Sequence, residues 1–122
     1  IFIGEMYQRW TIVGYRHFTD QKFFETAMTN LMHQYGVPSM IVSGGASGAD
    51  TLAHNFAVKH NIPTQIYHPA SYTRDALLAR NTLIVNDADL VVAFLSPASR
   101  GTWDTINKAN RAGKKLVIID IP

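Results

Sequence analysis

The stretch with the clearest chemical potential is a glycine-rich turn at residues 43–50, with the sequence Ser-Gly-Gly-Ala-Ser-Gly-Ala-Asp. It lies between an apolar run at 40–42 and a helical stretch at 49–60. A strand that passes through small residues into a helix directs unpaired N–H groups and the positive end of the helix dipole at one place, which suits a phosphate or another anion. The turn is neither a G-x-G-x-x-G fingerprint nor a lysine-containing phosphate loop, so a tight structural turn is the alternative interpretation.

Asp50, the last residue of this turn, has competing interpretations. It contacts the sugar or base of a bound nucleotide, or it caps the helix that follows and complements the helix dipole. His54 lies one helical turn later on the same face, so the two side chains could also pair with each other. The sequence leaves these alternatives open.

A second anion site is expected where Gly101 and Thr102 open another helix, because the first turn of a helix has free N–H groups. Arginine is the side chain best shaped to grip a phosphate through two hydrogen bonds. Arg16 follows the first predicted strand, and Arg80 stands next to Asn81 within a predicted helix. By residue type alone, Arg80 also suits a solvent-exposed helix surface.

Several other kinds of site are disfavoured. The sequence contains no cysteine, which excludes disulfides and thiolate chemistry. Its histidines show no ligand-like pairing, and no serine stands in a G-x-S-x-G elbow. We therefore expect no metal site, no serine hydrolase and no required cofactor. Asp87 and Asp89 could suggest paired catalytic acids, but we interpret them as the end of a helix and the start of a strand.

Length and composition indicate one domain, since the chain has 122 residues and 47% of them are apolar. Because the chain begins at Ile1, we assign residues 1–8 to an N-terminal extension with little weight in the fold and residues 9–122 to the domain. Apolar runs are strand-sized, shorter than the roughly 18 residues that a membrane span requires, and no signal segment is present. We expect a soluble, cytoplasmic protein without membrane association, and apolar helix and strand surfaces favour a homo-oligomer.

Strands and helices are expected to alternate along the chain. Aromatic and β-branched residues predict strands at residues 9–14, 40–43, 64–67, 89–94 and 116–120. Apolar residues at three- and four-residue spacing predict a first helix that is capped by Asp20 or Thr19 and stopped by Gly36. Further helices are expected at residues 49–60, 76–85 and 102–112.

This alternation predicts an α/β, Rossmann-like doubly wound sheet of about five parallel strands with helices on both faces. In the common strand order 3-2-1-4-5, the order reverses between strands one and four, and ligands bind beyond the carboxyl ends of the strands at that point. The loops at residues 14–16, 43–50 and 96–102 should therefore converge on one cleft.

Several segments together resemble the SLOG superfamily, and most closely its YspA/cpYpsA-related (YAcAr) branch. The matching segments are residues 13–20, residues 43–50 with Leu52 and Ala53, Arg80 with Asn81, residues 87–89, and Gly101 with Thr102. They cover nearly the whole domain in the family's order and spacing. The resemblance implies a Rossmann-like domain that binds a nucleotide or nucleotide-derived ligand, as a sensor or a nucleotide-processing protein.

The leading hypothesis is a nucleotide-phosphate cleft. In it the N–H groups of residues 44–48 and of Gly101 and Thr102 hold phosphate. Arg16 and Arg80 neutralise the phosphate, and Asp50 and Asn81 contact the sugar or base. The full set of predicted ligand-binding residues is Gly14, Arg16, Ser43, Gly44, Gly45, Ala46, Gly48, Asp50, Arg80, Asn81, Arg100, Gly101 and Thr102.

Lonely-guy phosphoribohydrolases, which belong to the same superfamily, release the base from a nucleoside monophosphate with an arginine and the glutamate of P-G-G-x-G-T-x-x-E. This sequence keeps the Gly-Thr pair but has Thr105 in place of the glutamate. Asp104 stands one residue earlier, about 100° away around a helix. If the chain is an enzyme of this kind, Arg80 and Asp104 are its candidate catalytic residues. The missing glutamate makes binding a better-supported prediction than hydrolysis of an N-glycosidic bond.

The DNA-processing protein A family has the pattern S-G-x-A-x-G-I-D-x-x-A-H, which residues 43–54 resemble, and an Arg-Asn motif that Arg80 and Asn81 match. This resemblance implies an alternative function, the binding of single-stranded nucleic acid, which needs a basic groove and stacking aromatic rings. The net charge of +2 is small for that function, so we rank it second. Residues that could supply the groove and rings are Arg16, Arg74, Arg80, Arg100, Tyr15, Tyr72 and Trp103.

Overall fold

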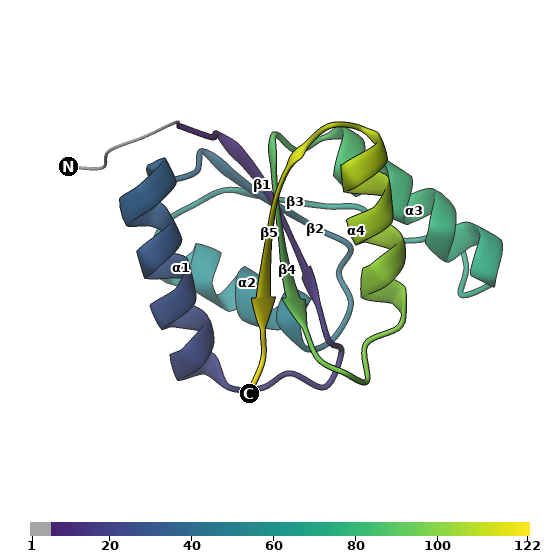
Figure 1. Cartoon of the computed structure of the whole chain (residues 1–122), viewed down its shortest axis with the longest axis horizontal. Coiled ribbons are helices and arrows are strands. Elements are labelled where there is room, and N and C mark those ends of the chain that lie inside the picture. The colour runs from purple at the N-terminus through teal and green to yellow at the C-terminus, as the bar shows by residue number, and fades with distance from the viewer. Residues whose placement is uncertain (1–5) are drawn as a thin grey trace.

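The computed structural model describes residues 6–122 as one five-stranded sheet with helices on both faces. The strands are β1 (Arg9–Gly14), β2 (Met40–Ser43), β3 (Thr64–Ile66), β4 (Leu90–Leu95) and β5 (Lys115–Asp120). The helices are α1 (Gln21–Tyr35), α2 (Ala49–Lys59), α3 (Arg74–Asn86) and α4 (Gly101–Arg111). Helices α1 and α2 cover one face of the sheet, and α3 and α4 cover the other (Figure 1). This is the predicted Rossmann-like α/β fold.

The strand order is β3-β2-β1-β4-β5, and every neighbouring pair is parallel. The predicted order is confirmed. Strand β1 lies at the centre, with Trp10 beside Ile41 of β2 on one side and Gly14 beside Phe94 of β4 on the other. Because the order reverses between β1 and β4, the loops that leave these strands turn toward opposite faces and leave a crevice between them.

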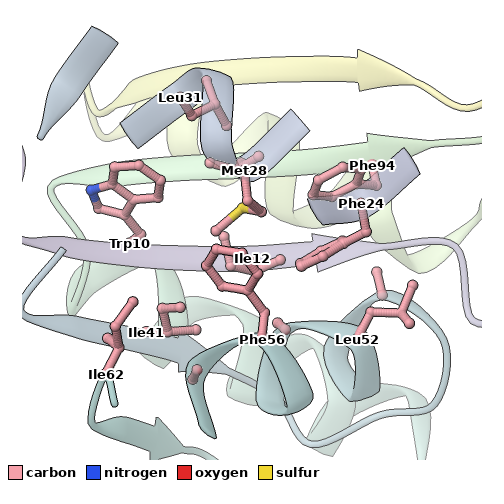
Figure 2. Close-up of a cluster of buried hydrophobic side chains, with 14 of the residues drawn as sticks. Trp10, Ile12, Phe24, Met28, Leu31, Ile41, Leu52, Phe56, Ile62 and Phe94 are labelled. Atoms are coloured by element: carbon pink, nitrogen blue, oxygen red, sulfur yellow. The ribbon is translucent and has the colours of Figure 1, made fainter. Parts of the chain in front are cut away.

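Side chains of β1 alternate between the two faces, which explains why the strand is apolar almost throughout. Trp10 and Ile12 point toward α1 and α2, and Figure 2 shows them in one cluster with Phe24 and Phe56, with Ile12 next to Phe56. The intervening Thr11 faces α3, and its buried hydroxyl donates to the carbonyl of Ile84 at 2.5 Å. A strand covered on both faces needs an apolar or fully hydrogen-bonded side chain at each position.

Four phenylalanines form the centre of the core and fix the loop that follows β1. The ring of Phe24 lies 4.8 Å from that of Phe94 and 6.0 Å from that of Phe56, between centroids. Phe18 belongs to the loop, and its ring stacks on Phe94 at 5.6 Å. Full burial of one such side chain stabilises a fold by about 1.5–3 kcal/mol. Phe18 therefore anchors the loop that carries Arg16.

Local signals explain the helix ends. Asp20 caps α1 by accepting a hydrogen bond from the N–H of Phe23 at 3.0 Å, and Gly36 follows the helix with a φ of 84°. Helix α3 begins earlier than predicted, at Arg74, because the hydroxyl of Thr73 accepts from the N–H of Ala76 at 3.3 Å. The other differing boundaries are displaced by one residue from those predicted.

The segment before β1 is partly integrated into the fold. Residues 1–5 of the predicted extension lie outside the described residues. The N–H of Tyr7 donates to the carbonyl of Tyr35 at 3.2 Å, and the N–H of Gln8 donates to a carboxylate oxygen of Asp89 at 3.0 Å. The other oxygen of Asp89 accepts from the N–H of Arg9 at 2.9 Å. The low weight predicted for the whole of 1–8 is therefore wrong for residues 7 and 8.

Asp87 ends α3, as predicted, and joins three elements. Its carboxylate accepts from Nε of Arg9 at 2.7 Å and from the hydroxyl of Tyr67 at 2.8 Å. The hydrogen bond from Arg9 lowers the pKa of the Asp87 carboxyl, and the bond from Tyr67 adds to that effect. The carboxylate of Asp87 is therefore hydrogen-bonded to other parts of the fold, and Asp87 belongs to none of the loops predicted to bind the ligand.

Candidate functional site

A cleft of about 730 Å³ opens where the strand order reverses. Its walls come from the loop after β1, the glycine turn with the start of α2, helix α3, and the loop after β4 with the start of α4. Clefts that bind small ligands commonly have volumes of about 300–1,000 Å³. The lining residues are Val13, Gly14, Tyr15, Arg16, His17, Ala46, Asp50, Leu77, Arg80, Asn81, Ile84, Ala98, Ser99, Arg100, Gly101, Thr102 and Thr105.

Most of the predicted ligand-binding residues line this cleft. They are Gly14, Arg16, Ala46, Asp50, Arg80, Asn81, Arg100, Gly101 and Thr102. Four others, Ser43, Gly44, Gly45 and Gly48, are outside the lining and shape the turn itself. Asp104 is also outside the lining, whereas Thr105 is part of it. The sequence reasoning missed Ser99 as a lining residue, and it named Thr105 only as the residue in place of the phosphoribohydrolase glutamate, not as a ligand-binding residue. A signal for Thr105 was its position three residues after Thr102, on the same helix face.

The carboxylate of Asp50 fills the inside of the glycine turn. Its Oδ2 accepts hydrogen bonds from the N–H of Gly44 at 3.2 Å and from the N–H of Ala46 at 3.0 Å. The N-cap of α2 is Gly48, so the predicted helix-capping role of Asp50 is wrong. Its partners are Gly44 and Ala46, and the possible pairing with His54 is not observed. Two of the N–H groups expected to hold phosphate are thus bonded to a carboxylate of the same chain.

Burial changes the acidity of Asp50. The residue is 7% exposed, and desolvation raises the pKa of its carboxyl to about 6. The hydrogen bonds from Ala46 and Gly44 and the positive charge of Arg80 act in the opposite direction, because each favours the ionised form. The cleft therefore contains a carboxylate that is ionised at neutral pH and protonated in mildly acidic solution.

Two glycines allow the turn to approach its neighbours closely. Gly48 has a φ of 76°, and a Cβ there would overlap the carbonyl oxygen of Tyr15 and the backbone of Arg16. At Gly44, a Cβ would overlap the guanidinium group of Arg80. Position 48 therefore requires a residue without a side chain, whereas a Cβ at position 44 would require the end of the Arg80 side chain to move.

Arg80 lies across the glycine turn and starts a chain of polar contacts. Its Nη1 donates to the carbonyl of Gly44 at 2.6 Å, and its Nε donates to Oδ1 of Asn81 at 3.1 Å. The amide of Asn81 donates to Asp104 at 3.1 Å, and Asp104 also pairs with Lys108 at 2.7 Å. These contacts connect the glycine turn with α3 and α4, and they hold Asp104 between Asn81 and Lys108.

The start of α4 presents hydrogen-bonding groups to the cleft. Arg100 is the N-cap residue, and no side chain caps the first turn. Thr102 and Thr105 are 7% and 1% exposed, and within residues 6–122 neither hydroxyl has a hydrogen-bond partner. No buried side-chain oxygen or nitrogen is unpartnered in that range, so both hydroxyls keep access to the cleft. Unused hydroxyls beside a helix N-terminus are suited to an anionic oxygen.

Positive charge surrounds the opening of the cleft. Arg16 and Arg100 are exposed, and in the described part of the chain neither side chain has a hydrogen-bond or ion-pair partner. Arg80, from α3, contributes a third guanidinium to the lining. Three arginines on one cleft, with one carboxylate on its wall, favour a ligand that is mainly anionic.

Neither a metal site nor a membrane span was found in residues 6–122. No three histidine or acidic side chains within that range are grouped closely enough to hold a metal ion. No helix in the range is long and apolar enough to cross a membrane.

Comparisons with known proteins point to one family. The family model described as DNA recombination-mediator protein A matches residues 3–71, which is more than half of the chain. A search of curated proteins found no match. The X-ray structure of DNA processing protein A from Streptococcus pneumoniae superposes with a TM-score of 0.70 and 22% sequence identity. The match covers 95% of this chain and 50% of that one, so this chain spans about half the length of that structure.

Proposed function

Since the chain belongs to the DNA recombination-mediator protein A family, we propose that its cleft binds single-stranded nucleic acid through the phosphate backbone. One observation carries this proposal: Arg16, Arg80 and Arg100 approach a single cleft from three different elements. Phosphate contacts by arginine supply most of the sequence-independent affinity for nucleic acid.

The start of α4 is the best-suited position for one phosphate group. There the free hydroxyls of Thr102 and Thr105, the first N–H groups of the helix and the side chain of Arg100 lie in one wall of the cleft. A helix N-terminus stabilises negative charge, and the hydroxyls add donors. The glycine turn is less suited, because Asp50 already accepts from two of its N–H groups.

Three aromatic side chains, Tyr15 in the cleft lining and two exposed rings outside it, favour a single strand over a duplex. Trp103, in the first turn of α4, is 47% exposed, and Tyr72, two residues before α3, is 88% exposed. Tyr15 lines the cleft itself. Unpaired bases stack on such rings with about 1–3 kcal/mol per base, whereas the bases of a duplex are already stacked.

Fluorescence anisotropy with a labelled single-stranded oligonucleotide of about 16 nucleotides tests this function, since single-strand sites span up to roughly that length. We expect binding that weakens with salt and exceeds binding of the matching duplex. Arg80→Ala and Trp103→Ala should both weaken it, the first with a smaller salt slope and the second with an unchanged one. No detectable binding at low salt rejects the proposal.

A second candidate function is binding of a nucleotide or nucleotide-derived small molecule. The volume of the cleft, about 730 Å³, supports it, because this space suits a small ligand. A thermal-shift titration with nucleoside mono- and diphosphates, NAD, ADP-ribose and cyclic dinucleotides tests it. An absence of any shift at millimolar concentration rejects it. This second candidate function has no hydrolytic step, because Thr105 occupies the position of the phosphoribohydrolase glutamate and Asp104 is bonded to Asn81 and Lys108.

A further inference from the structure

The two carboxylate oxygens of Asp50 have different surroundings. Oδ2 accepts two N–H groups, from Gly44 and Ala46, which occupy both of its in-plane acceptor positions. Oδ1 has no hydrogen-bond partner in residues 6–122. Because no side-chain oxygen in that range is both buried and unpartnered, Oδ1 keeps access to the outside. Asp50 lines the cleft, so that access is from the cleft.

A free carboxylate oxygen in a cleft surrounded by arginines imposes a direction on the ligand. It repels a phosphate group and attracts a hydrogen-bond donor. The glycine turn is therefore closed to phosphate, and a neutral donor of the ligand must face it. The hydrogen bonds from Gly44 and Ala46 to Oδ2 hold the carboxylate in place, and this fixes the direction in which Oδ1 faces the cleft.

We propose that Asp50 is a specificity-determining residue that accepts one hydrogen bond from the nucleoside part of the bound strand. This inference rests on the proposed nucleic-acid function. The donor is a base N–H or a ribose hydroxyl, and the two sources share the same chemistry. Each of the four bases has a donor N–H on its pairing edge, so one acceptor of this kind requires an unpaired base without selecting a sequence.

The ligand itself provides the sharpest test, because it needs no change to the protein. In a thymidine oligonucleotide the base N3–H is the only donor of an internal nucleoside, and N3-methylation removes it. We expect the wild-type protein to bind N3-methylated oligothymidine at least about tenfold more weakly than oligothymidine, the equivalent of one hydrogen bond to a charged group. An N3-methylated oligouridine, which has a 2′-hydroxyl, shows which source is used: rescued binding indicates the ribose, and unrescued binding indicates the base.

A variant pair assigns the effect to Asp50. Asp50→Asn keeps an oxygen for the N–H groups of Gly44 and Ala46 and presents an amide donor to the cleft, so N3-methylation should no longer weaken binding. Asp75→Asn makes the same charge change at an exposed position outside the cleft lining and should preserve the wild-type ratio. Thermal unfolding checks that Asp50→Asn folds, and the wild-type comparison decides the matter if it does not.

The outcomes separate this inference from the function on which it rests. If wild-type protein binds methylated and unmethylated oligothymidine equally well, and binds N3-methylated oligouridine no more tightly than either, the role of Asp50 is overturned and the proposed function stands. The same conclusion follows if Asp50→Asn folds and keeps the wild-type ratio. If no oligonucleotide binds at all, the role of Asp50 and the proposed function are both rejected.

Discussion

The guanidinium of Arg80 lies against the backbone of Gly44, with 2.6 Å between Nη1 and the Gly44 carbonyl oxygen. A methyl group at position 44 would occupy the space of that guanidinium. The position of the Arg80 guanidinium in the cleft therefore depends on the absence of a side chain at Gly44, which belongs to a different element.

Replacing Gly44 by alanine should displace Arg80 and weaken oligonucleotide binding by about tenfold, the equivalent of about 1.4 kcal/mol. Stability should change little, because the overlapping atoms are the mobile end of a long side chain. Anisotropy and urea denaturation measure the two effects. The effect of Gly44→Ala on binding should disappear in an Arg80→Ala background, as a double-mutant cycle requires when one residue acts through the other. Additive losses would contradict this explanation.

Removing Arg100 should lower both the affinity for a single strand and its salt dependence. For each phosphate that is no longer neutralised, the slope of log K against log salt should become less steep by about 0.7. Arg111→Ala is the matched control, because Arg111 is exposed at the other end of α4 and is outside the cleft lining. Equal slopes in wild type and Arg100→Ala would place the phosphate elsewhere.

The buried carboxyl of Asp50 should make the protein less stable as the pH rises from about 4 to 6. Its folded pKa of about 6 exceeds the ordinary value of 3.8, so between these values the folded state holds a proton that the unfolded state has released. Stability falls through that window and is level above it. Asp50→Asn does not titrate, so its free energy of unfolding should rise relative to wild type by up to about 3 kcal/mol across the window. Urea denaturation at pH 4, 5, 6 and 7 measures the difference.

The pKa of Asp87 is shifted in the opposite direction to that of Asp50, so its contribution to the pH dependence of stability must be separated from that of Asp50. Its pKa is lowered by Arg9, so it stabilises the fold above its unfolded pKa, and the contribution is lost as the pH falls. Comparing Asp50→Asn with wild type at each pH cancels that contribution, because Asp87 is unchanged in both proteins. A constant difference between the two proteins from pH 4 to 7 would contradict the assignment to Asp50.

Gly48→Ala should destabilise the protein by at least about 1–3 kcal/mol. Its φ of 76° is unfavourable for any residue with a Cβ, and the added atom would meet backbone rather than a movable side chain. Gly101→Ala is the control for stability, since a Cβ there has no neighbour within 4 Å. Chemical denaturation of both variants should show a large loss only at position 48. Similar stabilities would mean that the loops can separate without cost.

The sequence predicted the fold well because its signals are local and repeated. Apolar strands, helix spacing and stop residues such as Gly36 agree with the strand order and with most element boundaries. The site was predicted less completely. Asp50 accepts hydrogen bonds from the turn, and Arg80 lies over Gly44 instead of extending into solvent. Both arrangements depend on contacts between different elements. Such contacts follow from the packing of three elements and leave no periodic pattern in the sequence.

The central position of β1 also has a consequence for how the molecule folds. The backbone N–H of Arg9, at the start of β1, donates to the carboxylate of Asp89, next to β4, over a separation of 80 residues. Contacts over such separations form slowly, because a long loop must close before they contribute. Strands β1 and β2 with α1 and α2 can associate through nearer contacts, but the cleft needs β4 and α4 as its remaining wall. Hydrogen exchange during refolding should therefore protect the amides of β4 after those of β2, and capacity for the ligand should develop only with that final step.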